Sequence, residues 1–312
     1  MSGTSALILI ALGGGALALL IVVAVLGIAA YSAHSVVRPR RDWQPVDWSP
    51  PRPAPENVSF LNEQGQRLQG WYVAPLPGHP VALICHGFGT NRREGQDLLP
   101  WLASEGYGAL LFDFQAHGES DGHYTTVGLR EIGDVLTAVR YIQERVVPPA
   151  PIVALGFSMG ASVLIMAATR APAIRAFVLD SPFATLHRAV SRSFAVFFHL
   201  PPRVFTRPTI WFAERFTGGR IGEVQPVLEI SSVSPRPILI VQGIEDAIVH
   251  PQDSQLLYDA AGEPKSLWRI EGAGHVQARS VFPVEYRRRM FQTFEAAVGP
   301  VPVPAPSEAL AV

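Results

Sequence analysis

The stretch PIVALGFSMGASVLIMAATR, residues 151–170, decides the fold. Its apolar run 152–155 has the length and character of a buried parallel strand. Residues 161–169 are apolar on nearly every face, as expected of a buried helix. The pentapeptide GFSMG between them places Ser158 on a very tight strand-to-helix turn, where the two glycines avoid bulk. This context predicts that Ser158 is a nucleophile; a tight turn in another doubly wound sheet is the alternative.

The overall composition excludes several classes of protein. The 312 residues suffice for one large α/β domain with additions or for two small domains. The formal net charge of −1 gives no indication of an acidic ligand, and no nucleic acid is expected as a partner. The single cysteine, Cys85, excludes an intrachain disulfide framework and a multi-cysteine metal site.

The N-terminal segment differs from the rest of the chain. No Asp, Glu, Lys or Arg occurs in residues 1–37, and residues 6–30 are all apolar or glycine. As a helix, residues 6–30 would extend about 37 Å, enough to cross a hydrocarbon core of about 30 Å. A secretory signal peptide, the rival interpretation, would have a basic start and a shorter apolar core. We therefore expect residues 1–37 to form a single-pass anchor in the plasma membrane.

The segments that flank the globular domain carry further expectations. Arg38, Arg40 and Arg41 follow the apolar span, and the positive-inside rule then places the globular domain in the cytoplasm. Residues 38–56 are rich in proline and are expected to form an extended tether. Residues 299–312 are rich in proline and alanine and are expected to be a disordered tail.

The region 57–298 alternates apolar runs of strand type with amphipathic or apolar helices. This alternation predicts an α/β domain with a mainly parallel sheet and helices on both faces. The expected strands are 58–61, 68–73, 81–85, 109–112, 152–155, 176–179, 238–241 and 267–270, and the expected helices are 98–103, 129–147, 161–169, 254–261 and 284–298.

Residues 185–233 interrupt the alternation and are rich in phenylalanine and tryptophan. The segment is too long for a bare loop and too apolar to be solvated, so we expect an inserted helical lid over the carboxyl ends of the strands. Phe194, Phe198 and Trp211 are the candidates for contact with an apolar substrate. The alternative is that these aromatic side chains form ordinary helix core.

A nucleophilic serine needs a base, and the base needs an orienting acid. His275 follows the last expected strand in a glycine-rich loop that can carry its imidazole back to Ser158. Asp246 follows the preceding strand and is the first candidate for the acid. Glu245 is its neighbouring rival and is expected to point away, and Asp180, which ends another strand, is the second choice.

An acyl-transfer site also needs two convergent N–H donors for the oxyanion. Met159 directly follows the nucleophile at the start of a helix and is expected to supply one. Phe88, in the loop after the strand 81–85, is expected to supply the other. His86 is expected to support that loop, and Cys85 to be core. Asp113 is expected to hold its own loop by accepting backbone hydrogen bonds.

Six motifs occur in a familiar order: HGFGTNR, FDFQAHGESDG, ALGFSMGASV, LDSPFA, VQGIEDAIV and GAGHVQA. Over about residues 57–298 they resemble the α/β-hydrolase superfamily, in its bacterial serine-aminopeptidase-like or esterase-like branch, several members of which carry an N-terminal anchor. The resemblance implies an eight-stranded, mostly parallel sheet and the triad Ser158, Asp246 and His275. It implies no cofactor and no metal. Gln115 stands where many relatives have arginine, which puts a salt bridge from that loop in doubt.

Three functions are consistent with these residues. The first is a membrane-anchored serine hydrolase that cleaves a small-molecule carboxylic ester with an apolar part, through an acyl-enzyme. The second uses the same triad on a thioester or an amide, as a thioesterase, amidase or peptidase. The third is a non-catalytic, membrane-tethered binding module on the hydrolase scaffold, against which the presence of all three triad residues argues.

Overall fold

The computed structural model describes residues 3–41 and 55–300, and its centre is an eight-stranded sheet with the order β1-β2-β4-β3-β5-β6-β7-β8. The β1–β2 and β2–β4 pairs are antiparallel, and all the other pairs are parallel. The strands are β1 (Glu56–Leu61), β2 (Arg67–Val73), β3 (Val81–Cys85), β4 (Gly108–Phe112), β5 (Ile152–Phe157), β6 (Ile174–Asp180), β7 (Ile238–Gly243) and β8 (Lys265–Ile270). The mostly parallel eight-stranded sheet expected above is confirmed.

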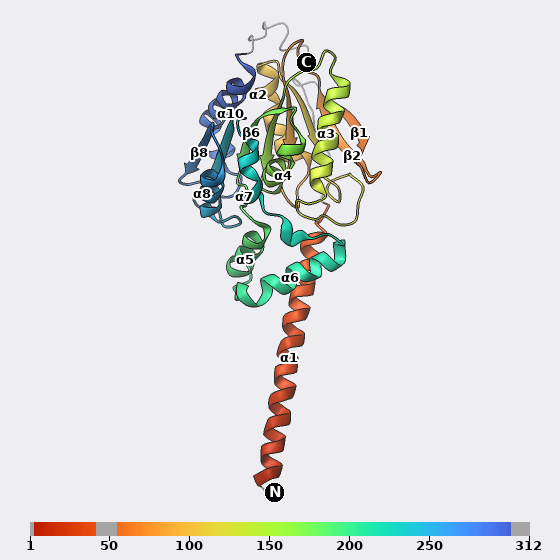
Figure 1. Cartoon of the computed structure of the whole chain (residues 1–312), viewed down its shortest axis with the longest axis vertical. Coiled ribbons are helices and arrows are strands. Elements are labelled where there is room, and N and C mark those ends of the chain that lie inside the picture. Colours follow the sequence, from red (N-terminus) through yellow and green to blue (C-terminus); the bar gives the residue numbers. More distant parts are fainter. Residues whose placement is uncertain (1–2, 42–54, 301–312) are drawn as a thin grey trace.

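Helices cover both faces of the sheet (Figure 1) because its central strands are apolar on both sides. In β5, Ile152 and Ala154 face one hydrophobic core, and Val153 and Leu155 face the other. The first core includes α3, α4 and α8, and the second includes α2 and α10. The helices of these layers are α2 (Leu99–Ser104), α3 (Glu131–Arg145), α4 (Met159–Ala167), α7 (Pro226–Glu229), α8 (Pro251–Ala260), α9 (Ala278–Val281) and α10 (Pro283–Val298), with 3₁₀ turns at Arg92–Leu98, Ala168–Arg170, Ile221–Glu223 and Ile230–Val233.

The segment between β6 and β7 forms the expected helical insertion. Its two main helices are α5 (Leu186–Val196) and α6 (Pro202–Thr217), which lie beyond the carboxyl end of the sheet (Figure 1). The Thr185 hydroxyl accepts a hydrogen bond from the Arg188 N–H at 3.2 Å and so caps the start of α5. Phe194 of α5 is buried and stacks on Phe205 of α6, with 5.5 Å between ring centroids. The aromatic residues of the insertion thus include helix core as well as exposed side chains.

Helix α1 (Gly3–Val37) projects from the same end of the domain as a long stem (Figure 1). By length and composition its part Ala11–Val37 is able to cross a membrane, a test that signal sequences also pass. Its side chains are exposed through residues 11–28, except for the half-buried Val25. Ala29, Ala33 and Val37 are fully buried, and this end of α1 packs against α6.

The end of α1 therefore packs into the same body as the sheet and its helices, although the sequence places a boundary at residue 37. The Thr125 N–H donates to the Val37 carbonyl at 2.9 Å. Residues 38–41 continue along the domain, and the Arg41 guanidinium donates to the Ser120 carbonyl at 2.8 Å. Residues 42–54 of the predicted tether, with Trp43 and Trp48, and residues 301–312 of the predicted disordered tail lie outside the described residues.

Candidate active site

Ser158 occupies the strained turn that the GFSMG pattern predicts. Its backbone has φ 48° and ψ −110°, a conformation that costs a non-glycine residue roughly 1–3 kcal/mol. A Cβ atom at Gly156 would lie 2.5 Å from the Ala161 nitrogen, and one at Gly160 would lie 2.3 Å from the Cys85 carbonyl oxygen. The turn is thus closed by backbone atoms on both sides of the serine, and only glycine fits at either position.

Gly160→Ala is expected to destabilise the protein by about 3 kcal/mol, the upper end of the usual cost of overpacking, because the clash is with backbone atoms. Gly133→Ala is the matched control. Gly133 lies within α3, and a Cβ there would meet nothing closer than 3.8 Å, so this variant is expected to gain about 0.5–1 kcal/mol of helix stability. Thermal unfolding of both variants in detergent micelles measures the two effects. Equal melting temperatures for the two variants would contradict the account of the turn.

His275 and Asp246 form a hydrogen-bonded pair at the carboxyl edge of the sheet. His275 Nδ1 and Asp246 Oδ2 are 2.7 Å apart, and the Asp246 side chain is buried. Asp246 Oδ1 accepts from the backbone N–H groups of Ile248 and Val249, each at 2.8 Å. Oδ2 also accepts from Gln242 Nε2 at 2.9 Å. Because four donors hold the carboxylate, Asp246 fixes the orientation of the imidazole.

The two rival acids lie elsewhere. Glu245 is exposed, as expected for a side chain that points away. Asp180 is fully buried and accepts from the Ser181 hydroxyl at 2.9 Å, but it makes no hydrogen bond to His275. Burial raises the pKa of Asp180 to about 6, against the opposing charge of Arg279. The geometry therefore favours Asp246 as the partner of His275.

The backbone brings Ser158 and His275 to the same place. The Ser158 N–H donates to the Asp180 carbonyl at 2.8 Å, and the hydroxyl of the next residue, Ser181, accepts from the Val276 N–H at 3.1 Å. Two hydrogen bonds thus link the elbow to the histidine loop. Within the part of the chain that the structure describes, the Ser158 hydroxyl makes no hydrogen bond, a contact that commonly tightens only with bound substrate.

The loop after β3 lies directly against Ser158. A Cβ atom at Gly87 would be 3.4 Å from the Ser158 Cβ. Glu94 Oε2 accepts from the Gly87 N–H at 2.6 Å. The neighbouring Phe88 N–H, by contrast, has no hydrogen-bond partner among the described residues. Met159 is the first residue of α4, where a helix leaves its N–H groups without intrahelical partners. The N–H groups of Phe88 and Met159 thus lie beside the serine without a hydrogen-bond partner among the described residues.

His86 supports this loop through both of its ring nitrogens, and only one protonation state of the ring fits. Its Nδ1–H donates to the Gly87 carbonyl at 2.6 Å, and its Nε2 accepts from the Phe114 N–H at 3.0 Å. A proton on Nε2 would face the Phe114 N–H, so the ring must be neutral. Burial lowers the pKa of His86 to about 4. His117, which packs edge-on against it, also has its pKa lowered by burial, to about 3.

These histidines are expected to make the protein less stable in acid. With a folded pKa below the unfolded value of about 6.5, the unfolded chain binds more protons between pH 6.5 and 4, so stability falls as the pH falls through that range. For His86 alone the loss is on the order of 3 kcal/mol. His86→Gln is expected to make the pH dependence of the unfolding free energy shallower by about one proton, whereas exposed His187→Gln keeps the wild-type slope. Equal slopes for all three proteins would contradict this assignment.

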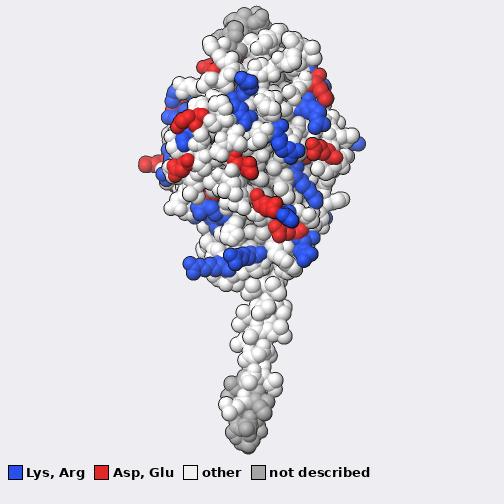
Figure 2. All heavy atoms as spheres, in the orientation of Figure 1, with Lys and Arg blue, Asp and Glu red and all other residues white. Residues whose placement is uncertain are grey.

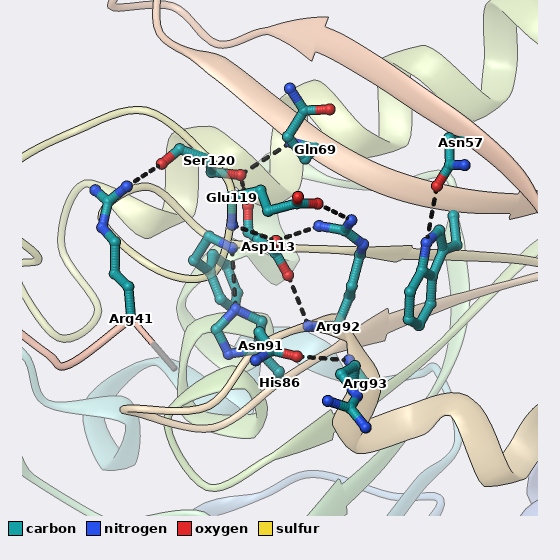
Figure 3. A network of polar contacts seen from close by, with 12 residues as sticks. Arg41, Asn57, Gln69, His86, Asn91, Arg92, Arg93, Asp113, Glu119 and Ser120 are labelled. Carbon is teal, nitrogen blue, oxygen red and sulfur yellow. Dashed lines mark hydrogen bonds and ion pairs between the residues drawn. The ribbon is translucent and has the colours of Figure 1, made fainter. Parts of the chain in front are cut away.

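Asp113 lies at the centre of the polar network that supports the same loop (Figure 3). It accepts from the backbone N–H groups of Arg92 at 2.7 Å and Glu119 at 2.9 Å. The expectation that Asp113 holds its loop is confirmed. The Arg92 guanidinium pairs with both the Asp113 and Glu119 carboxylates. Gln115 leaves the loop after β4 without an arginine of its own at that position. Arg92, from outside the loop, makes the salt bridges to Asp113 and Glu119.

Ser158 opens into a cavity of about 200 Å³ whose walls are mostly apolar. Of the residues expected at the site, Phe88, Met159, Phe194 and Phe198 line this cavity. Trp211 does not. It is half exposed on α6, so its predicted contact with substrate is not supported.

One wall of the cavity comes from α1, which the sequence analysis missed. Tyr31, Ser32, Ser35 and Val36 line the cavity together with residues of the elbow and the lid. The only sequence signal for this wall is that tyrosine and serines interrupt the apolar run after residue 30. Among the other lining residues that were not expected are Val127, Phe183, Leu186, Ala189, Val190, Ser193, Thr209, Ile248 and Val249.

Comparisons with known proteins agree with this architecture. Residues 78–217 match the family described as serine aminopeptidase, S33. The uncharacterised protein Rv2307c of Mycobacterium tuberculosis is 31% identical over 227 residues, which cover 72% of this chain and 73% of the relative. The uncharacterised protein YfhR of Escherichia coli (strain K12) is 28% identical over 254 residues, covering 78% of this chain and 82% of the relative.

The solved structure of the esterase Pf2001 of Pyrococcus furiosus superposes with a TM-score of 0.69 and 28% identity, over 85% of this chain and 99% of that one. The strand order, the serine elbow and these relatives lead to one conclusion: the chain belongs to the α/β-hydrolase superfamily, in its serine-aminopeptidase-like family.

Proposed function

We propose that this protein is a membrane-anchored serine hydrolase that cleaves carboxylic esters with an apolar part. The observation that carries the proposal is the arrangement at the carboxyl edge of the sheet. A strained serine opens into an apolar cavity, beside a histidine that a buried aspartate holds by a 2.7 Å hydrogen bond. The triad is Ser158, His275 and Asp246.

In this mechanism Asp246 keeps the proton of His275 on Nδ1, so that Nε2 is free to act as the base. His275 takes the Ser158 hydroxyl proton while the serine oxygen attacks the ester carbonyl. The N–H groups of Phe88 and Met159 stabilise the resulting oxyanion. The carbon–oxygen bond then breaks, and His275 returns the proton to the departing alcohol. Water attacks the acyl-enzyme by the same route and releases the acid.

The preference for an ester with an apolar part rests on the cavity and on one relative. The predominantly apolar walls favour an aliphatic or aromatic group next to the scissile bond. The Pyrococcus furiosus relative is an esterase. The thioesterase and amidase alternatives would use the same triad. The family description as a serine aminopeptidase is the observation that favours the amide.

The apolar part of α1 supports the membrane anchor of the proposal. Its side chains are exposed along residues 11–28, which suits contact with lipid and not with protein. Arg38, Arg40 and Arg41 follow the helix, which favours a cytoplasmic domain under the positive-inside rule. Protease treatment of intact cells tests the orientation, and cleavage of the domain from outside would overturn it.

The substrate class is tested on the full chain, because the end of α1 belongs to the cavity. The protein in detergent micelles is assayed on nitrophenyl esters of rising acyl length and labelled with a fluorophosphonate. We expect labelling, and turnover that increases with chain length at first by about tenfold or more per added methylene. Labelling without hydrolysis of any ester would favour the thioester or amide alternative. Absence of labelling would favour the binding module.

A further inference from the structure

The helix proposed as the membrane anchor also forms a wall of the catalytic cavity. Tyr31, Ser32, Ser35 and Val36 of α1 face the same cavity as Ser158. A helix that served only as a tether would have no reason to reach the nucleophile. The described chain continues from this wall without a break into the exposed apolar residues 11–28.

The length of α1 places the cavity at the surface of a bilayer. From Ala6 to Ile28 the helix extends about 33 Å, close to the hydrocarbon thickness of about 30 Å. Ala29 is the first residue that is fully buried against the domain. The cavity wall at residues 31–36 lies about 5–12 Å beyond Ile28 along the helix. A headgroup layer is about 5–8 Å thick, so the wall begins at the level of the headgroups. Tyr31, with 74% of its surface exposed, is at the level where membrane proteins place aromatic belts.

At the same end of the domain, the lid carries an exposed surface of arginine and tryptophan. On α6, Arg207, Trp211 and Arg215 share one exposed helical face, and the Arg215 guanidinium lies 5.2 Å from the centre of the Trp211 ring. Arg207 and Arg215 make no ion pair within the described part of the chain. Figure 2 shows basic side chains at the lower rim of the domain, beside the stem. Unpaired arginine with exposed tryptophan is the composition of a surface that contacts anionic headgroups.

From these observations we propose that the substrate is a single-chain lipid ester that enters from the bilayer along α1. This proposal rests on the proposed function and specifies its substrate. The acyl chain passes between α1 and the lid, and the ester reaches Ser158 at headgroup depth. The volume of about 200 Å³ is below the roughly 300–1,000 Å³ of common ligand pockets, which favours a lipid with one acyl chain over a lipid with two. Ser158 takes the acyl group, the headgroup alcohol leaves with the proton from His275, and water releases a fatty acid.

Contact with the membrane also accounts for an exposed aromatic side chain on α6 that the cavity does not explain. Trp211 lies outside the cavity, yet it is exposed between arginines on the face described above. Contact with headgroups accounts for this exposure. The same contact holds the lid at the membrane surface, where the cavity meets α1.

The test places a bulky group on the α1 wall after the protein has folded. Ser35 is exposed and lines the cavity, whereas the single native cysteine, Cys85, is buried. Full-length Ser35→Cys is reconstituted in vesicles of phosphatidylcholine with some phosphatidylglycerol and labelled with pyrene maleimide. Fatty acid release from palmitoyl-lysophosphatidylcholine in the vesicles is compared with hydrolysis of 4-nitrophenyl acetate from water. The matched control is Leu26→Cys, which is exposed, lies more than one turn below the cavity on the opposite side of α1 from Ser35, and is labelled in the same way.

We expect the label at position 35 to lower hydrolysis of the lysophospholipid at least about tenfold more than it lowers hydrolysis of the acetate. The labelled Leu26→Cys control is expected to retain both activities. Equal loss of the two activities, or no loss of either, would overturn the route along α1. Hydrolysis of the acetate without hydrolysis of the lysophospholipid by the wild type would overturn the lipid substrate alone. Absence of both activities in the wild type would contradict the proposed function itself.

Discussion

Ser158→Ala is expected to reduce ester hydrolysis on the order of 10⁶-fold, which corresponds to about 8 kcal/mol of transition-state stabilisation. Without the serine oxygen no acyl-enzyme forms, and His275 has no hydroxyl proton to take. The small residual rate would come from the oxyanion donors and from binding. The measurement is kcat/KM on a nitrophenyl ester that the wild type hydrolyses, with the full chain in micelles.

The effect of Ser158→Ala on stability must be measured separately from its effect on catalysis. Alanine accepts the strained backbone at position 158 no worse than serine does, since both carry a Cβ and neither caps α4 through its side chain. The melting temperature of Ser158→Ala is therefore expected to equal or exceed that of the wild type. A stable variant with wild-type turnover would eliminate the serine mechanism, and a second nucleophile would have to be found.

Asp246→Asn has the second-largest expected effect, a loss of about 10⁴-fold in kcat. The Asp246 carboxylate accepts from His275, Gln242 and two backbone N–H groups. An asparagine presents an NH₂ group to one of these donors. If that donor is His275 Nδ1, the ring must turn or change tautomer, and Nε2 no longer serves as the base. The measurement is kcat on the nitrophenyl ester used for Ser158→Ala.

Asp180→Asn is the matched control for Asp246→Asn. Both carboxylates are buried at the carboxyl edge of the sheet, but only Asp246 bonds to His275. Burial raises the pKa of Asp180 to about 6, so neutralising it removes a group whose ionisation the fold already disfavours. Its kcat is expected to stay within about tenfold of the wild type. A larger loss of kcat in Asp180→Asn than in Asp246→Asn would mean that Asp180, and not Asp246, is the acid that orients His275.

A large part of the site could be predicted from local patterns. The elbow depends on residues that are neighbours in the chain, and only glycine fits the close backbone approaches on either side of Ser158. The positions of Asp246 and His275 follow from strand ends, because parallel strands bring their carboxyl ends to one edge. These features are local, or they repeat with the period of a strand, and a sequence records them directly.

Other features depend on contacts between distant segments. Arg92 pairs with Asp113 and Glu119 across more than twenty residues, and the sequence had indicated only that Gln115 could not make such a pair. Trp211 looked like a cavity residue from its neighbours, but the turn of α6 directs it outward. In an aromatic-rich helix the period does not decide which side faces the core.

The sequence by itself determined the strand-to-helix elbow at Ser158, the order of the catalytic candidates and the apolar N-terminal segment. Only the tertiary structure decided that this segment ends as a wall of the cavity. The physical reason is that α1 is apolar on all sides along most of its length, so no stripe marks the face that packs on α6. Burial of Ala29, Ala33 and Val37 appears only when helices separated by more than 160 residues of chain meet beside the elbow.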